Sequence, residues 1–402
     1  DFSEVTLTSI TSYRTFDRFE DADIDFTSAR LISTNSSNTE IETLTQEFRL
    51  TSTGDGPVDW LVGAFFFDET VDISDRVLYD DQFRPYGDVL STTAAGGTPF
   101  VDPSPLSQLE GALSLPAGTF FAEGQGVSGT AGQDDQTFNL FAQVDWEVSD
   151  RVTVTLGANY TEVDKNAFVN LTSTDALSSV TLTQVGFAQI FGTLTGGLLP
   201  TPPNLAANPG AAGTAQGLSM VPCSAATGPA CNPLLALQPF QFLPPFVGFP
   251  NAVESGNSSD DDVTWTARIA YDMNDNLNVY LSAGTGFKAT SWNLSRDSRP
   301  FASDQAALDA SGLLASNVSL GTRFAGPEEA TVYEIGMKAQ FESFAINVAV
   351  FDQSIEGFQS NIFSGTGFGL SNAGEQSTTG VEMDLAWYPV DNFQFNFAAT
   401  VL

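Results

Sequence analysis

The chain has 402 residues, no histidine, and a formal net charge of −35 that comes from 49 acidic and 14 basic residues. This acidity argues against nucleic acid as a partner, because phosphate groups require a basic footprint. The absence of histidine excludes histidine-based triads, histidine general bases and zinc sites with histidine ligands. Hydrophobic residues make up 42% of the chain, so we expect a folded protein rather than a disordered one.

Segments in which apolar and polar residues alternate follow one another along the chain, and this period of two is typical of β-strands with one apolar face. The expected strands lie at residues 3–16, 44–53 and 58–73, followed by hairpins at 134–167, 261–292, 328–360 and 381–401. No uninterrupted apolar run reaches the roughly 18 residues of a transmembrane helix. The sequence therefore predicts an all-β protein.

The hairpin at 134–167 shows the pattern most clearly. The apolar face of its first arm carries Phe138, Leu140, Ala142, Val144, Trp146 and Val148. After the turn Ser149-Asp150, the apolar face of the second arm carries Val152, Val154, Leu156, Ala158 and Tyr160. Phe141 is the exception, because it falls on the polar face. The arms are long enough to cross a bilayer at a tilt, which takes roughly 9–11 residues.

The connections between strands alternate strictly between short and long. The short ones are 54–57, 149–150, 274–276, 342–343 and 389–392, and the long ones are 17–43, 74–133, 168–259, 293–327 and 361–373. Aromatic residues such as Trp60, Trp146 and Trp387 lie beside the short turns. A soluble β-domain has little reason to place every long connection at one end, whereas an outer-membrane barrel has tight periplasmic turns, long outer loops and aromatic girdles.

The expected strands number eleven, and both ends of the chain lie inside a strand. A bacterial single-chain barrel normally has an even number of strands, and an open sheet in lipid would leave unpaired edges. We therefore interpret the chain as part of a longer protein that supplies the remaining strands.

Two cysteines, Cys223 and Cys231, lie close together in the Gly- and Pro-rich stretch VPCSAATGPACNP. A disulfide between them would close a small loop and would imply an oxidising compartment. Two unpaired buried thiols are the alternative.

The strand segments resemble the TonB-dependent receptors of the Gram-negative outer membrane, and most closely the iron–siderophore receptors. The stretches that carry the resemblance are LTSITSYRTFD (7–17), TQEFRLTST with VDWLVGAFFFDE (45–69), NLFAQVDWEVSDRVTVTLGANYTEVDK (139–165), VYLSAGTGFKATSWN (279–293), PEEATVYEIGMKAQF (327–341) and STTGVEMDLAWYPVDNFQFN (377–396). Their order and spacing are more specific than any one of them.

The resemblance implies a 22-stranded barrel in outer-membrane lipid, filled by an N-terminal plug and energised through the TonB complex of the inner membrane. This chain would be a partial transmembrane antiparallel β-barrel of about eleven strands, residues 1–402, with long extracellular loops at 74–133 and 168–259. The plug, its TonB-coupling segment and the closing strands are absent from it.

The resemblance also implies import of a large scarce solute, of which a ferric siderophore is our first expectation. For an anionic ferric chelate, the candidate ligand-binding residues are the few basic and aromatic residues of the outer loops: Tyr79, Arg84, Tyr86, Lys288, Trp292, Arg296 and Arg299. A structural role is the alternative for each of them.

No catalytic constellation, cofactor motif or metal site is expected. The run Asp260-Asp261-Asp262 is read as a solvated strand edge, with a calcium site as the alternative, and the glycines of 365–374 are read as a flexible loop. Two other functions stay open. One is a surface-exposed β-structural or adhesive protein that binds a partner through its long loops, and the other is a passive porin.

Overall fold

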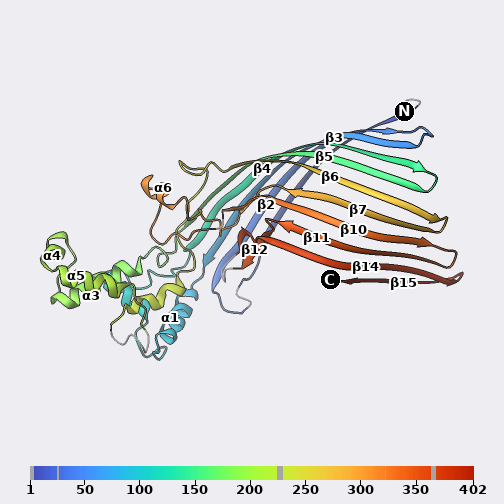
Figure 1. Ribbon diagram of the computed structural model, residues 1–402. Helices are drawn as coiled ribbons and strands as arrows, with labels where there is room; N and C mark the ends of the chain where they lie inside the picture. Colours follow the sequence, from blue (N-terminus) through green and yellow to red (C-terminus); the bar gives the residue numbers. More distant parts are fainter. Residues whose placement is uncertain (1–3, 25–26, 224–229, 322, 364–367) are drawn as a thin grey trace.

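A computed structural model describes residues 4–24, 27–223, 230–321, 323–363 and 368–402 of the chain. Its main feature is an antiparallel sheet of eleven strands in the order β1-β2-β3-β4-β5-β6-β7-β10-β11-β14-β15. Figure 1 shows these long strands side by side and curling together, with tight turns at one end and the helices at the other. The sheet is open, with β1 and β15 as its edges. The expected count of eleven strands is confirmed.

The strands of the main sheet are β1 (Val5–Asp21), β2 (Ile32–Ser52), β3 (Val58–Tyr79), β4 (Gly126–Ser149), β5 (Val152–Ser173), β6 (Asn257–Asn274), β7 (Leu277–Lys288), β10 (Glu328–Gln340), β11 (Phe344–Glu356), β14 (Glu375–Val390) and β15 (Phe393–Val401). Two small sheets pair β8 (Ser291–Trp292) with β9 (Phe324–Ala325) and β12 (Gln359–Phe363) with β13 (Phe368–Asn372). The helices are α1 (Phe83–Ala94), α2 (Pro105–Ala112), α3 (Leu182–Thr195), α4 (Pro202–Ala207), α5 (Pro209–Ser219), α6 (Gln305–Ala310) and the 3-10 helix η1 (Pro233–Phe240).

The sheet turns its apolar face outward, which is the reverse of a water-soluble protein. Trp146 is 50% exposed, Leu156 57% and Tyr333 55%, although all three are large and apolar or aromatic. Their polar neighbours on the opposite face, such as Asn139 and Gln143, are half-buried. Exposed apolar surface of this extent is typical of the outward face of a membrane β-barrel. Among the described residues, no helix is long and apolar enough to cross a membrane.

Several strands run further toward the long connections than the sequence pattern predicts. The predicted connection 17–43 is wrong, because β1 continues to Asp21 and β2 begins at Ile32. The predicted loops 74–133 and 168–259 are likewise too long, since regular strands end only at Tyr79 and Ser173. Beyond the apolar band the alternation of β3, β4 and β5 is reversed, because apolar residues such as Ile73, Ala131 and Val169 face inward in a buried cluster while the outward residues are mostly polar.

The long connections also contain structure that the sequence did not suggest. Six α-helices and one 3-10 helix are formed by described residues, and all lie at the end away from the tight turns (Figure 1). The connection predicted at 361–373 contains the β12–β13 hairpin, while residues 364–367 of the expected glycine-rich flexible loop lie outside the described residues.

Phe141, the exception to the alternation of β4, lies on the inward face opposite Gly63 of β3. A Cβ atom at Gly63 would lie 2.4 Å from Cζ of the Phe141 ring and 2.8 Å from the carbonyl oxygen of Phe48. The ring therefore occupies the space that the glycine leaves. Tyr280 covers Gly336 in the same way on β7 and β10.

We expect Gly63→Ala to destabilise the folded protein by about 1–3 kcal/mol, because the new methyl group must displace the Phe141 ring. The matched control is Gly54→Ala in a tight turn, where no atom lies within 4 Å of the added carbon. The measurement is the temperature at which the compact form is lost in a heat-modifiable gel shift. Equal loss temperatures for the two variants would contradict the packing assignment.

Candidate ligand site at the outer end of the sheet

A cavity of about 1790 Å³ lies on the inward face of the sheet, at the end with the long connections. One wall is formed by the ends of β1, β2 and β3, and the other by α1 and the segment after η1. Three of the seven residues predicted to bind ligand line it: Tyr79, Tyr86 and Arg296. Drug-sized ligands occupy pockets of roughly 300–1,000 Å³, so this cavity admits a larger solute.

Tyr79 ends β3 and joins the strand to the helical connection. Its ring stacks on that of Phe83 in α1 with a centroid distance of 4.1 Å, and its hydroxyl donates a 3.4 Å hydrogen bond to Asp175 Oδ2. The side chain is only 2% exposed, and burial raises its pKa, so the phenol stays protonated. Tyr79 therefore forms a rigid part of the cavity wall rather than a freely reaching side chain.

Tyr86 lies one helical turn after Phe83, so both rings project from one face of α1 toward the cavity. Tyr86 is 44% exposed. Arg296 reaches the cavity from the connection that follows β7. These two residues are placed where a solute entering from the outer end would meet them.

Arg84 faces away from the cavity and is held by carboxylates. Its guanidinium forms an ion pair with Glu110, a residue 1% exposed, and a 3.0 Å pair with Asp88 one turn along α1. Glu110 also accepts a 2.9 Å hydrogen bond from the backbone N–H of Phe120. Arg84 thus joins α1 to α2, which is the structural alternative for this residue.

The other three predicted ligand residues also lie outside the cavity. Lys288 is half-exposed at the end of β7, with its Nζ 3.9 Å from Glu328 Oε1. Trp292 stacks on the ring of Phe249 at a centroid distance of 5.3 Å, and its other neighbour, the ring of Phe324, lies tilted by 54° at 5.1 Å. Arg299 is buried over the ring of Phe246, and burial lowers its pKa to about 10.

Most of the apolar cavity wall was not anticipated from the sequence. Leu31 and Ile32 come from the start of β2, and Phe240, Phe242 and Leu243 come from the end of η1 and the segment after it. Of the lining residues that the sequence analysis missed, only Asp75 and Val77 could have been predicted. Extending the alternation of β3 as far as Tyr79 would have placed both on the inward face. The other residues belong to a connection in which nothing periodic points to a contact with distant strands.

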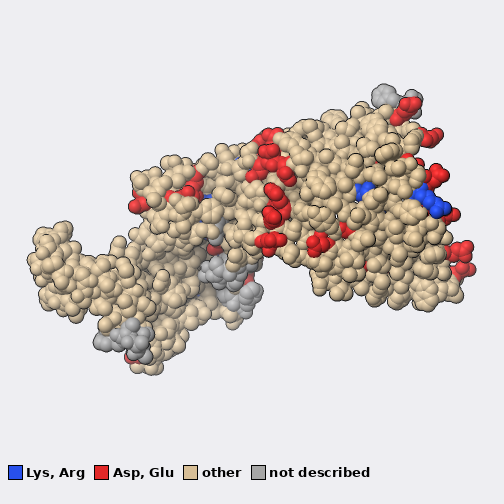
Figure 2. All heavy atoms as spheres, in the orientation of Figure 1, with Lys and Arg blue, Asp and Glu red and all other residues tan. Residues whose placement is uncertain are grey.

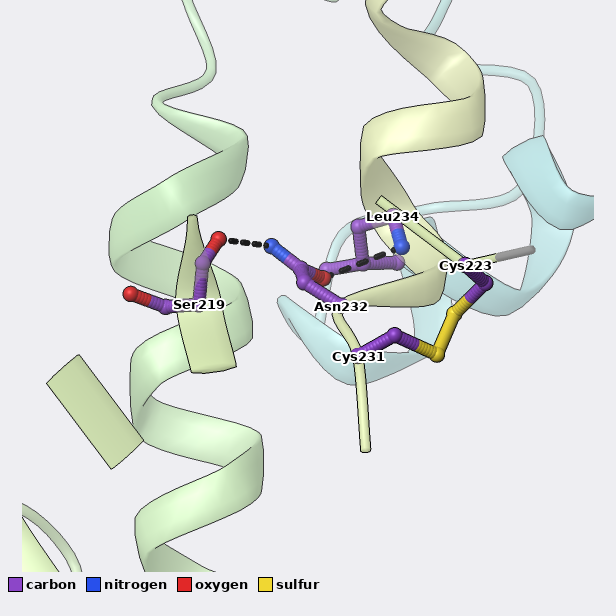
Figure 3. The surroundings of a disulfide bond; sticks show 5 residues. All are labelled: Ser219, Cys223, Cys231, Asn232 and Leu234. Carbon is purple, nitrogen blue, oxygen red and sulfur yellow. Dashed lines mark hydrogen bonds between the residues drawn. A yellow bond between two sulfur atoms is a disulfide. The ribbon is translucent and has the colours of Figure 1, made fainter. Parts of the chain in front are cut away.

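Figure 3 shows Cys223 and Cys231 joined by a disulfide next to Asn232, with an S–S distance of 1.93 Å. The fully buried Asn232 side chain accepts a 3.0 Å hydrogen bond from the backbone N–H of Leu234 and donates to the carbonyl oxygens of Ser219 and Leu182, at 2.9 and 3.1 Å. These contacts tie α3, α5 and η1 into one unit. The disulfide closes the loop that connects α5 to η1 within this unit.

The inward face of the strands carries charges of both signs. Arg268 lies 4.4 Å from the centroid of the Tyr280 ring, and the Tyr280 hydroxyl donates a 2.6 Å hydrogen bond to Glu334 Oε1. Asp272 accepts a 2.8 Å hydrogen bond from Asn278. Lys165 pairs with Asp135 at 3.3 Å on the same face, whereas Nε of Arg268 is buried without a hydrogen-bond partner among the described residues.

The run Asp260-Asp261-Asp262 does not converge on one point. Asp260 faces inward and accepts a 3.0 Å hydrogen bond from the backbone N–H of Thr290, while Asp261 points to the exposed face. In the part of the chain that the structure describes, no three His, Cys, Asp or Glu side chains are grouped so that they could hold a metal ion.

The sequence of the chain was compared with models of known protein families. The family described as TonB dependent receptor-like, beta-barrel, matches residues 1–401. The chain belongs to this family. TonB-dependent receptors are β-barrel proteins of the outer membrane, and the outward apolar and inward polar faces of this sheet are the arrangement expected of such a barrel.

Two solved structures share the fold at TM-scores above 0.5, and a third is similar at a lower score. The ferric yersiniabactin uptake receptor FyuA from Yersinia pestis is 14% identical, with a TM-score of 0.55 over 100% of this chain and 40% of that one. The copper transporter OprC is 10% identical, with a TM-score of 0.53 over 99% and 44%. The siderophore receptor PiuA from Acinetobacter baumannii is 15% identical, with a TM-score of 0.47 over 99% and 44%. A search of curated protein sequences finds no match.

The chain therefore spans about two-fifths of the length of these structures. At such low identities the likeness concerns the fold, because binding residues on loops diverge faster than the strands that carry them.

Proposed function

We propose that the chain forms part of the wall of a receptor that imports a large scarce solute, a ferric siderophore, across the outer membrane by coupling to TonB. The observation that carries the proposal is the cavity of about 1790 Å³ on the inward face, at the end of the long connections. A solute arriving from outside meets this cavity before the barrel interior. FyuA, which shares the fold, is a ferric yersiniabactin uptake receptor, and this supports iron chelates as the first class to test.

The size and lining of the cavity fit such a solute. Aromatic walls provide large contact areas at little cost in conformational entropy, and Tyr79 and Phe83 are already stacked before any ligand arrives. Tyr86 and Arg296 supply polar groups that can orient the solute. Arg84, Lys288, Trp292 and Arg299 act indirectly, because they hold together the connections that build the walls.

The test measures the uptake of iron-55 chelates by iron-starved cells. These cells express the receptor and have no other outer-membrane receptor for the chelate. We expect accumulation to require both the receptor gene and an intact TonB complex. Replacing Tyr86 by alanine should weaken binding about tenfold or more, as loss of an aromatic anchor commonly does.

Receptor-dependent uptake that persists without TonB would instead identify a passive porin. Absence of any receptor-dependent uptake, together with adhesion to a surface partner, would identify the adhesive alternative.

A further inference from the structure

The charge of the cavity differs from what an anionic ligand requires. Arg296 is its one basic residue among those described, whereas Glu20, Asp75 and Asp297 contribute carboxylates. Glu20 forms an ion pair with Arg18. Asp75 makes no hydrogen bond or ion pair with any described residue, and it lies on the inward face of β3. A polyanion placed in this cavity would meet the carboxylate of Asp75, which no described cation compensates.

The buried cations of the outer end cannot easily offset these carboxylates. Arg84 is bound to Glu110 and Asp88, and Arg323 is bound to Glu254. Breaking either buried pair would cost several kcal/mol before its cation could turn toward a ligand, whereas Arg30 forms an exposed pair with Asp81 outside the cavity lining.

One segment of the wall opposite the strands carries no charge. Residues 176–253 contain no Asp, Glu, Lys or Arg, although the chain as a whole has a net charge of −35. This segment includes α3, α4, α5 and η1, and in Figure 2 the end of the molecule formed by these helices shows no red or blue on the face in view. Its contribution to the cavity is the apolar set Phe240, Phe242 and Leu243.

From these observations we infer that the outer cavity selects a large, mainly apolar solute without net negative charge. This inference rests on the proposed import function and names its substrate class as uncharged iron chelates rather than polyanionic ones. Recognition then comes from aromatic and aliphatic contact with the walls, with Arg296 and the tyrosine hydroxyl of Tyr86 as orienting groups. The carboxylate of Asp75 acts as the excluding group.

The inference predicts an order of affinities for two chelates of similar size. An uncharged ferric tris-hydroxamate should bind outer membranes that carry the receptor at least tenfold more tightly than a trianionic ferric tris-catecholate, measured with iron-55 at low ionic strength. Asp75→Asn should reduce the ratio of the two affinities roughly three- to tenfold. The change should come from tighter binding of the tris-catecholate alone, since the substitution removes repulsion with a trivalent anion. The ratio of the two affinities should also fall as the salt concentration rises, because salt screens the repulsion.

The matched control is Asp72→Asn, which makes the same change of charge three residues away, on the outward face of β3. It should leave both affinities unchanged. Equal or tighter binding of the tris-catecholate by the unaltered receptor would overturn the inference while leaving import intact. An equal response to Asp75→Asn and Asp72→Asn would also overturn it. If neither chelate bound or entered the cell, the proposed import of iron chelates would itself fail.

Discussion

Replacing Arg323 by alanine is expected to open the outer connections locally, at a cost of about 3–5 kcal/mol. The guanidinium forms 2.7 and 2.8 Å hydrogen bonds to the two carboxylate oxygens of Glu254 and a 3.0 Å bond to the carbonyl oxygen of Val247. It also lies 4.4 Å from the centroid of the Phe249 ring. Arg323 is 1% exposed, so its removal would leave the Glu254 carboxylate buried without its cation.

This pair joins the connection between β5 and β6 to the connection between β7 and β10, and so it fixes the segment that supplies Phe242 to the cavity. The measurement is limited proteolysis of intact cells, which should cleave the outer connections roughly 100-fold faster or more in Arg323→Ala. The double variant Arg323→Met with Glu254→Gln should recover most of the resistance, because no buried charge is then left unpaired.

The matched control for the ion pair is Arg30→Ala, which breaks an exposed pair with Asp81. The side chains of Arg30 and Asp81 are 63% and 45% exposed, and exposed pairs contribute only about 0–1 kcal/mol. Protease resistance should therefore be almost unchanged. If Arg30→Ala and Arg323→Ala were cleaved at the same rate, the buried pair would not hold the connections together.

Placing an arginine on the outward face at Ala142 is expected to destabilise the barrel by about 2–4 kcal/mol, the cost of a cation near the bilayer midplane. Ala142 lies opposite Val62 on one side and Ala158 on the other, and all three belong to the apolar outward face. Its position along β4 is roughly midway between the exposed Trp146 near the tight turn and the polar stretch before Phe138.

Gln143→Arg is the control, because the same side chain one residue later points inward. Gln143 already donates a 3.0 Å hydrogen bond to Asp145 Oδ2, so an arginine there has a carboxylate within reach. We expect a change of about 0.5 kcal/mol or less. The midpoints of urea unfolding in lipid vesicles would measure both. Similar midpoints for the two variants would contradict the assignment of the inward and outward faces.

The charge distribution explains why the apolar band has a defined outer limit. Figure 2 shows carboxylates gathered in a band across the strands. The exposed acidic residues on the outward face include Asp134, Glu162, Asp164 and Asp261. Below them, toward the tight turns, the outward positions are mostly apolar and those of β4, β5 and β6 carry no acidic or basic residue, since a charge within the hydrocarbon would lose its hydration.

The sequence by itself determined the strands that cross the membrane, their order and the face that each turns to lipid. It could do so because lipid selects every second residue, and a period of two survives in the sequence without any knowledge of distant contacts. The tight turns and the aromatic residues beside them were visible for the same reason. Trp146 and Trp387 are exposed beside the tight turns, where an aromatic girdle is expected, because of their own position on a strand.

Only the tertiary structure decided which residues of the outer connections form a site. Seven loop residues were selected by type alone, and the fold brings Tyr79, Tyr86 and Arg296 to one cavity while it uses Arg84, Trp292 and Arg299 inside the connections. Whether an arginine is free to bind a ligand or is paired with a carboxylate depends on residues that are distant in the sequence. Arg323 and Glu254 are an example of such a pair. No local pattern records such pairs, because water covers the connections and imposes no period on them.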